Sequence, residues 1–126
     1  MIIDTDVLIW YLRGNKEAQK TINASIPFKI SVITYLELIQ GVQDKRELRI
    51  LQKYLKAWST EIIQINENIS SRAMFFTEDY YSNNSMETGD ALIAATAIER
   101  QEVLVTANDK HYGFIPNIQI NKFRPK

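Results

Sequence analysis

The chain has 126 residues, 45% of them hydrophobic, and its 15 basic and 15 acidic residues give a formal net charge of zero. This length fits one domain spanning residues 1–126 with a buried core. The charge balance excludes a globally basic nucleic-acid-binding protein, and the lack of cysteine excludes disulfides and thiolate metal sites.

Short apolar runs rich in Ile and Val alternate along the chain with segments of helical periodicity. In chain order we predict a strand over 1–4, helices over 7–13 and 16–24, a strand over 29–33, helices over 34–41 and 44–58, a strand over 61–65, helices over 67–81 and 91–100, and strands over 102–106 and 118–120. Residues 82–85 predict a turn. Strands that alternate with helices indicate an α/β fold, in which helices cover both faces of a parallel sheet.

Polar residues stand at the predicted helix starts. Thr5 or Asp6 is the expected cap of the first helix, and Asp90 that of the Ala-rich one. Thr34 and Glu37 match the capping-box pattern, in which each side chain bonds the other residue's backbone. The apolar run at the N-terminus is too short to cross a membrane and lacks a basic leader, so we expect a cytoplasmic protein.

Four acidic residues follow strands or turns, namely Asp4, Glu37, Asp90 and Asp109. The carboxyl ends of parallel strands share one edge of a sheet, which is where ligands bind. Carboxylates that converge at such an edge repel one another by roughly 4 kcal/mol per pair at ~4 Å. The pattern therefore predicts a bound hard cation, Mg²⁺ or Mn²⁺.

Taken singly, each acid has a structural explanation as a cap or a turn residue. Asp4 is the exception, because an unpaired carboxylate in an apolar run is costly to bury. The functional interpretation depends on the combination of the four acids.

The chain resembles the PIN-domain ribonucleases, and in particular the VapC toxins of bacterial toxin–antitoxin pairs. The resemblance covers nearly the whole chain and rests on four segments, IIDTDVLIWYLRG, SVITYLELIQG, GDALIAATAIE and LVTANDKHYGFIP. It implies a three-layer α/β/α sandwich with a central, mainly parallel sheet. It also implies a Mg²⁺-dependent endoribonuclease, acting for example on transfer RNA, that leaves 5′-phosphate and 3′-hydroxyl ends.

The resemblance carries over to individual residues. Asp4, Glu37 and Asp90 match the first three acids of the family. The fourth acid is often found where this chain has Asn108, and Asp109 follows it directly. Asp6 stands where the family often has Asn, so it is a candidate outer ligand. Candidates for orienting the acids or holding water are Thr5 and Thr106.

The resemblance also implies partners, namely a homodimer and an antitoxin whose C-terminal segment covers the site. Apolar residues beyond those one sheet face requires are Leu36, Leu38, Ile39, Leu48, Leu51 and Leu55. Part of this surface is a candidate for such contacts.

Basic and aromatic residues are the candidates for RNA contacts. A stripe of Arg46, Arg49, Lys53 and Lys56 is either a phosphate-binding face or an ordinary solvated helix face. Arg13 and Lys110 lie closer to the expected site, and His111 is a candidate phosphate contact. Aromatic residues that either stack on bases or pack in the core are Trp10, Tyr11 and Tyr112.

Two alternatives remain open at this point. The order Asp4-Thr5-Asp6-Val7 is similar to the opening motif of haloacid-dehalogenase-type phosphatases, although Ala94 and Ala95 replace the later acid of that family. The other alternative is a PIN-like module that binds RNA or a partner without catalysis. The acids at Asp4, Glu37 and Asp90 argue against a silent module.

Overall fold

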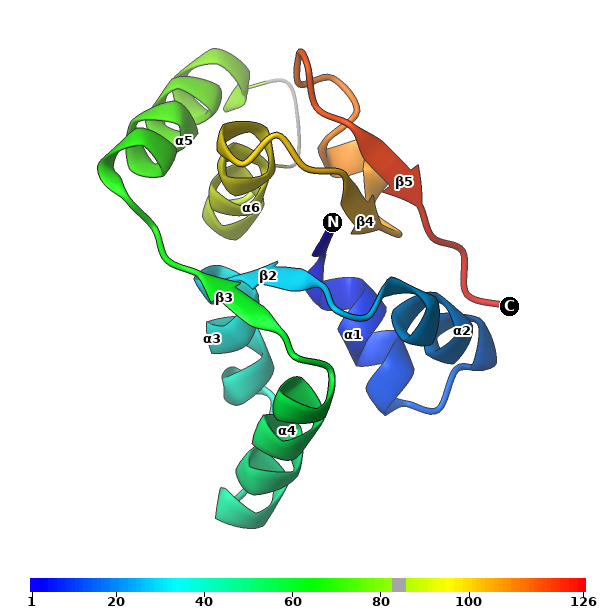
Figure 1. The fold of residues 1–126 in the computed structure, drawn as a ribbon. Coiled ribbons are helices and arrows are strands. Elements are labelled where there is room, and N and C mark those ends of the chain that lie inside the picture. Colours follow the sequence, from blue (N-terminus) through cyan, green and yellow to red (C-terminus); the bar gives the residue numbers. More distant parts are fainter. Residues whose placement is uncertain (83–85) are drawn as a thin grey trace.

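A five-stranded sheet with helices on both faces forms the protein (Figure 1). The computed structural model describes residues 1–82 and 86–126. Its elements are β1 (Ile2–Ile3), α1 (Thr5–Leu12), α2 (Lys16–Ser25), β2 (Lys29–Ser31), α3 (Val32–Gln40), α4 (Lys45–Ala57), β3 (Glu61–Ile63), α5 (Glu67–Tyr80), α6 (Thr88–Glu99), β4 (Leu104–Thr106), η1 (Asp109–His111) and β5 (Ile120–Lys122). The predicted turn at 82–85 falls mostly outside the described residues.

The strands follow the order β3-β2-β1-β4-β5, and every pairing among them is parallel. The first strand of the chain is therefore the central one, with Ile2 opposite both Lys29 and Leu104. This arrangement confirms the predicted α/β sandwich, and it places Asp4, directly after β1, in the middle of the carboxyl edge.

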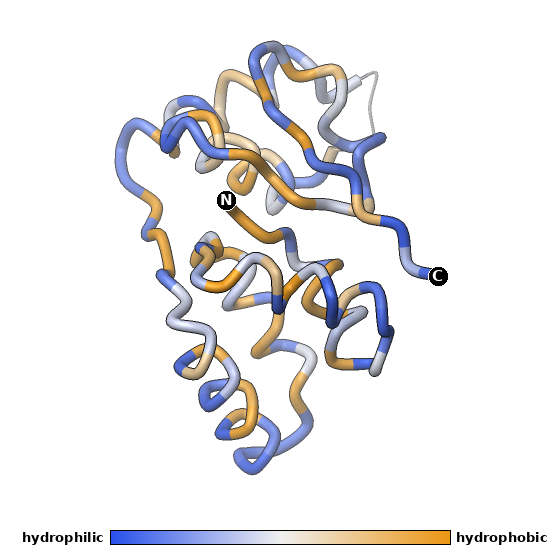
Figure 2. Tube along the Cα trace, turned by 45° about the vertical axis from the view of Figure 1, so that its right-hand side comes forward, coloured by the Kyte–Doolittle hydropathy of each residue, from blue (hydrophilic) through white to orange (hydrophobic). Residues whose placement is uncertain are grey.

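The alternation of side chains along each strand divides the core into two clusters. Ile2 and Leu104 point into the cluster beneath α5 and α6, whereas Ile3 and Val105 point into the cluster formed with α1, α2 and α4. Figure 1 shows α5 and α6 on one side of the sheet and α1 to α4 on the other. In Figure 2 the N-terminal segment is hydrophobic and lies inside the fold, while the C-terminal end is hydrophilic.

Three predicted helix starts are wrong by a few residues. The cap of α1 is Asp4, which accepts a hydrogen bond from the Thr5 amide at 2.8 Å. The cap of α3 is Ser31, whose hydroxyl accepts from the Ile33 amide. The cap of α6 is Glu87, so Asp90 lies within the first turn of that helix. Each segment offers several residues able to cap a helix, and tertiary contacts select among them.

Among the described residues, no helix is long and apolar enough to span a membrane. Asp44 caps α4, since its carboxylate accepts from the Glu47 amide at 2.9 Å. Leu51 and Leu55 of α4 are buried, together with Trp58 at its C-terminal cap.

Candidate functional site

Asp4 is a carboxylate buried at the centre of the carboxyl edge. Only 4% of its surface is exposed. Its Oδ1 accepts from the Thr5 amide, and its Oδ2 accepts from the hydroxyls of Thr106 at 2.7 Å and Tyr112 at 3.1 Å. The Thr106 hydroxyl in turn accepts from the Asn108 amide at 2.9 Å. The segment after β4 therefore fixes the orientation of the acid that follows β1.

Burial and a neighbouring acid perturb Asp4. Loss of hydration raises the pKa of Asp4 to about 7, with the charge of Asp6 as a further cause. Burial also raises the pKa of Asp6. The Asp6 carboxylate accepts from the amides of Val7 and Ala107, so it joins α1 to the end of β4. Burial and the neighbouring charge therefore destabilise the charged form of Asp4, and its hydrogen bonds only partly offset this effect.

Glu37 reaches the same edge from α3. Its Oε1 accepts from the Thr5 hydroxyl at 2.6 Å, and that hydroxyl lies 3.0 Å from the hydroxyl of the buried Thr34. A hydroxyl has one proton and a carboxylate only accepts, so Thr5 donates to Glu37. The predicted capping box of Thr34 with Glu37 is therefore absent from α3, where Ser31 caps the helix and Glu37 faces α1.

Asp90 occupies the third helical position of α6. Its Oδ2 accepts from the Glu87 amide at 3.1 Å and completes a capping box, while its Oδ1 lies 3.3 Å from the Tyr112 hydroxyl. His111 Nδ1 lies 3.3 Å from Asp90 Oδ2, an ion pair whenever the imidazole is protonated. Asp90 is therefore both a helix-terminal acid and a neighbour of Asp4 through Tyr112.

Shared neighbours bring Asp4, Glu37 and Asp90 together. Thr5 bonds Asp4 through its amide and Glu37 through its hydroxyl, and the Tyr112 hydroxyl contacts both Asp4 and Asp90. A Cβ at Gly89 would lie 3.1 Å from Glu37 Oε2. Glu37 thus lies against the backbone just before Asp90, an approach that suits glycine.

The fourth predicted acid faces in another direction. Asp109, in η1, pairs with Arg124 at 2.8 Å and lies 3.9 Å from Lys122. The Arg124 guanidinium is the main cause that lowers the pKa of Asp109. Asn108 contributes its amide to Thr106, while its side chain is exposed. Asp109 therefore joins the C-terminal segment to η1, whereas the other three acids share the hydrogen-bonding neighbours Thr5 and Tyr112.

The donor chemistry of the three acids suits a hard divalent cation, since carboxylate oxygens are what Mg²⁺ and Mn²⁺ prefer. The raised pKa of Asp4 shows that its negative charge is under-compensated by the protein itself. In their present orientations, however, no three acidic or histidine side chains within 1–82 and 86–126 form a ready set of metal ligands. Asp4, Glu37 and Asp90 therefore suit a cation in charge and in donor type. In this structure their carboxylates face the hydroxyls of Thr5, Thr106 and Tyr112.

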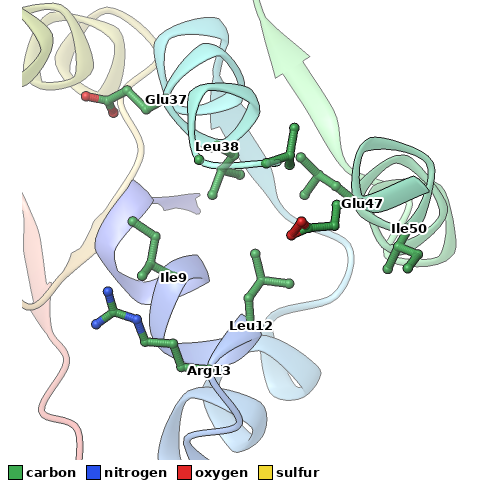
Figure 3. Close-up of a pocket in the computed structure, with 10 residues that line it drawn as sticks. Ile9, Leu12, Arg13, Glu37, Leu38, Glu47 and Ile50 are labelled. Carbon is green, nitrogen blue, oxygen red and sulfur yellow. The ribbon is translucent and has the colours of Figure 1, made fainter. Parts of the chain in front are cut away.

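An apolar groove borders the acids between α1, α3 and α4 (Figure 3). Its volume is about 430 Å³, and its lining residues are Ile9, Leu12, Arg13, Glu37, Leu38, Gly41, Val42, Glu47, Ile50 and Leu51. Figure 3 shows Glu37 at one side of the groove, with its carboxylate turned away from Glu47. Glu37 is the one clustered acid among the residues that line the groove, so the groove adjoins the acid cluster at Glu37.

The basic stripe lies on the exposed face of α4, where all four of Arg46, Arg49, Lys53 and Lys56 face solvent. The Arg13 guanidinium lies 5.9 Å from the centre of the Trp10 ring. Tyr11 packs edge-to-face against Trp58, with ring centres 5.0 Å apart. Lys110 is exposed in η1.

Tyr112 is the residue whose place in the site the sequence did not reveal. The sequence predicts either base stacking or core packing for Tyr112, and its complete burial excludes stacking on a base. Its hydroxyl meets two acids that lie 108 and 22 residues away along the chain. The available signal was its position within the fourth segment, LVTANDKHYGFIP, which the topology brings beside β1.

Comparison with known proteins gives consistent matches. The family model for the PIN domain matches residues 1–114. Ribonuclease VapC10 of Mycobacterium tuberculosis is 34% identical over 126 residues, covering 94% of this chain and 90% of that protein. A toxin–antitoxin complex from Klebsiella pneumoniae has a chain with 29% identity and a TM-score of 0.74 over 93% of both chains. A DNA-bound VapBC complex from Salmonella typhimurium matches in fold, with a TM-score of 0.82 at 23% identity over 96% of both chains.

Proposed function

The chain belongs to the PIN-domain family and within it to the VapC ribonucleases, and we propose that it is a divalent-metal-dependent endoribonuclease acting as the toxin of a toxin–antitoxin pair. The observation that carries the proposal is the meeting of Asp4, Glu37 and Asp90 around Thr5 and Tyr112. Family membership removes the phosphatase alternative. The silent binding module differs from the proposal in that it would bind RNA or a partner without cleaving RNA.

Each of the three acids keeps acceptor capacity beyond its protein hydrogen bonds, because a carboxylate has about four lone-pair sites. Asp4, Glu37 and Asp90 would hold Mg²⁺, for which Mn²⁺ is the expected substitute. When bound, such an ion stabilises charge on phosphoryl oxygens and lowers the pKa of water. The protein residues orient the acids, and the expected products carry 5′-phosphate and 3′-hydroxyl ends.

The surrounding residues have supporting roles in this proposal. Thr5 and Thr106 orient the acids through their hydroxyls. Asp6 holds the end of β4 against α1. Asp109 is the fourth acid, and its pairing with Arg124 favours an indirect effect through the position of β5 and η1. Asn108 acts through its amide on Thr106.

We propose that an antitoxin segment lies in the groove between α1, α3 and α4. The groove is mainly apolar, borders Glu37 and presents Arg13, a combination that suits an amphipathic segment. A solved structure of similar fold from Klebsiella pneumoniae is a toxin–antitoxin complex, and another from Salmonella typhimurium is a DNA-bound VapBC complex. A segment seated there would lie beside the acids and obstruct the approach of RNA.

We further propose a homodimer and an RNA path near the acids. Met74 and Phe75 on α5 are 63% and 60% exposed, a placement that suits contact with a second copy. Arg13 and Lys110 are the proposed phosphate contacts, and transfer RNA is the proposed target.

A Glu37→Gln variant tests the catalytic proposal. Gln keeps an oxygen that can accept from Thr5, so we expect an unchanged melting temperature, whereas the loss of one ligand charge should reduce RNA cleavage by orders of magnitude. Glu78→Gln, at an exposed position of α5, is the matched control. Purified protein would be assayed on RNA with Mg²⁺ and with EDTA. Equal activity of wild type and Glu37→Gln would contradict the assignment, and an inactive wild type would favour the silent module.

Mapping of RNA ends in cells after induction identifies the target. Asp4→Asn serves as the inactive control. New 5′-phosphate ends confined to transfer RNA would support the proposed substrate, and ends confined to another RNA class would replace it.

A further inference from the structure

The Tyr112 hydroxyl lies between two carboxylates, 3.1 Å from Asp4 Oδ2 and 3.3 Å from Asp90 Oδ1. A phenol has a single proton, so the two acids share one donor at nearly equal distances. We propose that Tyr112 is a positioning residue that sets the separation of Asp4 and Asp90 and thereby makes the site selective for a small divalent cation. This inference rests on the proposed function, because it concerns the same acids.

The ring of Tyr112 is held rigidly. It is completely buried within the core cluster that includes Ala91, Ala94 and Ile115. Its backbone amide donates to the Asp109 carbonyl at 3.1 Å, and its carbonyl accepts from the Ile115 amide at 2.9 Å. A tyrosine side chain has only two main torsions, so core packing fixes where the hydroxyl lies. The phenol oxygen is therefore a fixed point between the acids.

Each acid also has separate local support. The Thr5 amide and the Thr106 hydroxyl hold Asp4, and the Glu87 amide holds Asp90. Among the hydrogen bonds of residues 1–82 and 86–126, the Tyr112 hydroxyl alone contacts both carboxylates. Removing this hydroxyl should leave each acid oriented by its own local contacts. The separation of Asp4 and Asp90 should then no longer be fixed.

Because ions differ in size, a change in the separation of Asp4 and Asp90 should change which ion the site prefers. Mg²⁺ requires ligand distances of about 2.0–2.1 Å, whereas Ca²⁺ accepts about 2.3–2.6 Å and more variable geometry. If Tyr112 sets the spacing, its loss should weaken Mg²⁺ binding more than Ca²⁺ binding. General damage to the fold would weaken both ions alike.

Tyr112→Phe tests this inference, because it removes the hydroxyl and keeps the ring. Tyr80→Phe is the matched control, since Tyr80 packs against the same core cluster with its ring 4.7 Å from Phe114. Binding of Mn²⁺ would be followed by electron paramagnetic resonance, with Mg²⁺ and Ca²⁺ as competitors. We expect about a tenfold loss of Mg²⁺ affinity in Tyr112→Phe, a smaller loss for Ca²⁺, and no change in Tyr80→Phe.

The outcomes separate this inference from the proposed function. Wild-type Mg²⁺ affinity and ion preference in Tyr112→Phe would overturn the role of Tyr112 and leave the nuclease proposal intact. Equal losses for the two ions would likewise overturn it, as a merely structural role. A wild-type protein that binds none of these ions would overturn both proposals together.

Discussion

At the scale of single residues, burial favours the protonated form of Asp4, whereas a bound cation would favour its charged form. Burial raises the pKa of Asp4 to about 7, so the folded protein holds this proton more tightly than the unfolded chain does, whose Asp pKa is near 3.8. The stabilising contribution is therefore present at low pH and is lost as the pH rises toward 7. The pKa of Asp6 is shifted in the same direction. The pKa of Asp109 is lowered, so its contribution to folding stability is already fully present in mildly acidic solution.

We predict that the metal-free protein is more stable at about pH 5 than at about pH 8. Thermal melts in EDTA across this range measure the effect, with an upper limit of about 1.4 kcal/mol per pH unit for one group. Asp4→Asn should flatten the dependence, and Mg²⁺ should weaken it, because a cation favours the charged carboxylate. A melting temperature that rises with pH in EDTA would contradict the assignment.

Asp109 and Arg124 allow a test of direct against indirect action. If Asp109 acts by holding the C-terminal segment, Asp109→Asn and Arg124→Gln should each raise the Mg²⁺ concentration for half-maximal cleavage by the same few-fold factor, since each removes one half of the 2.8 Å ion pair. A direct metal ligand would behave differently. In that case Asp109→Asn would impair cleavage far more than Arg124→Gln.

At the scale of elements, the groove joins α1, α3 and α4 to the acid cluster. Ile50 lines it on α4, whereas Lys53 lies on the exposed face of the same helix. We predict that Ile50→Glu abolishes neutralisation by the antitoxin while RNA cleavage persists, because it places a charge in the apolar groove. Lys53→Glu should be neutralised normally. Co-expression growth assays and cleavage by the free protein measure the two properties, and full neutralisation of Ile50→Glu would place the antitoxin elsewhere.

The elements themselves were largely predictable from the sequence. Alternating apolar runs and helical periodicity predict a parallel sheet, and such a sheet brings residues after β1 and β4 to one edge. The helix starts were less predictable, because the choice between Ser31 and Thr34 as the cap of α3 depends on Thr34 being buried against Thr5. The position of the Tyr112 hydroxyl was less predictable still, since its contact with Asp4 depends on how the Tyr112 ring packs in the core. Local patterns contain no information about such contacts.

At the scale of the whole molecule, α5 exposes the large apolar side chains of Met74 and Phe75. We predict that Phe75→Lys converts a dimer into monomers, because a charge replaces a largely exposed aromatic side chain in the proposed contact. Sedimentation velocity at several concentrations measures this, and Glu78→Lys on the same helix controls for added charge. A wild-type protein that stays monomeric, or a variant that stays dimeric, would remove α5 from the interface.

The position of β1 determines when the acid cluster can assemble during synthesis of the chain. The central strand is synthesised before the other four strands of the sheet, yet it pairs with β4, and Asp4 contacts Thr106 and Tyr112, which lie 102 and 108 residues later in the chain. A chain still emerging from the ribosome therefore cannot hold its first acid in place. The growing polypeptide therefore lacks an assembled acid cluster until Thr106 and Tyr112 have been synthesised. The topology of the sheet thus separates translation of β1 in time from assembly of the proposed active site.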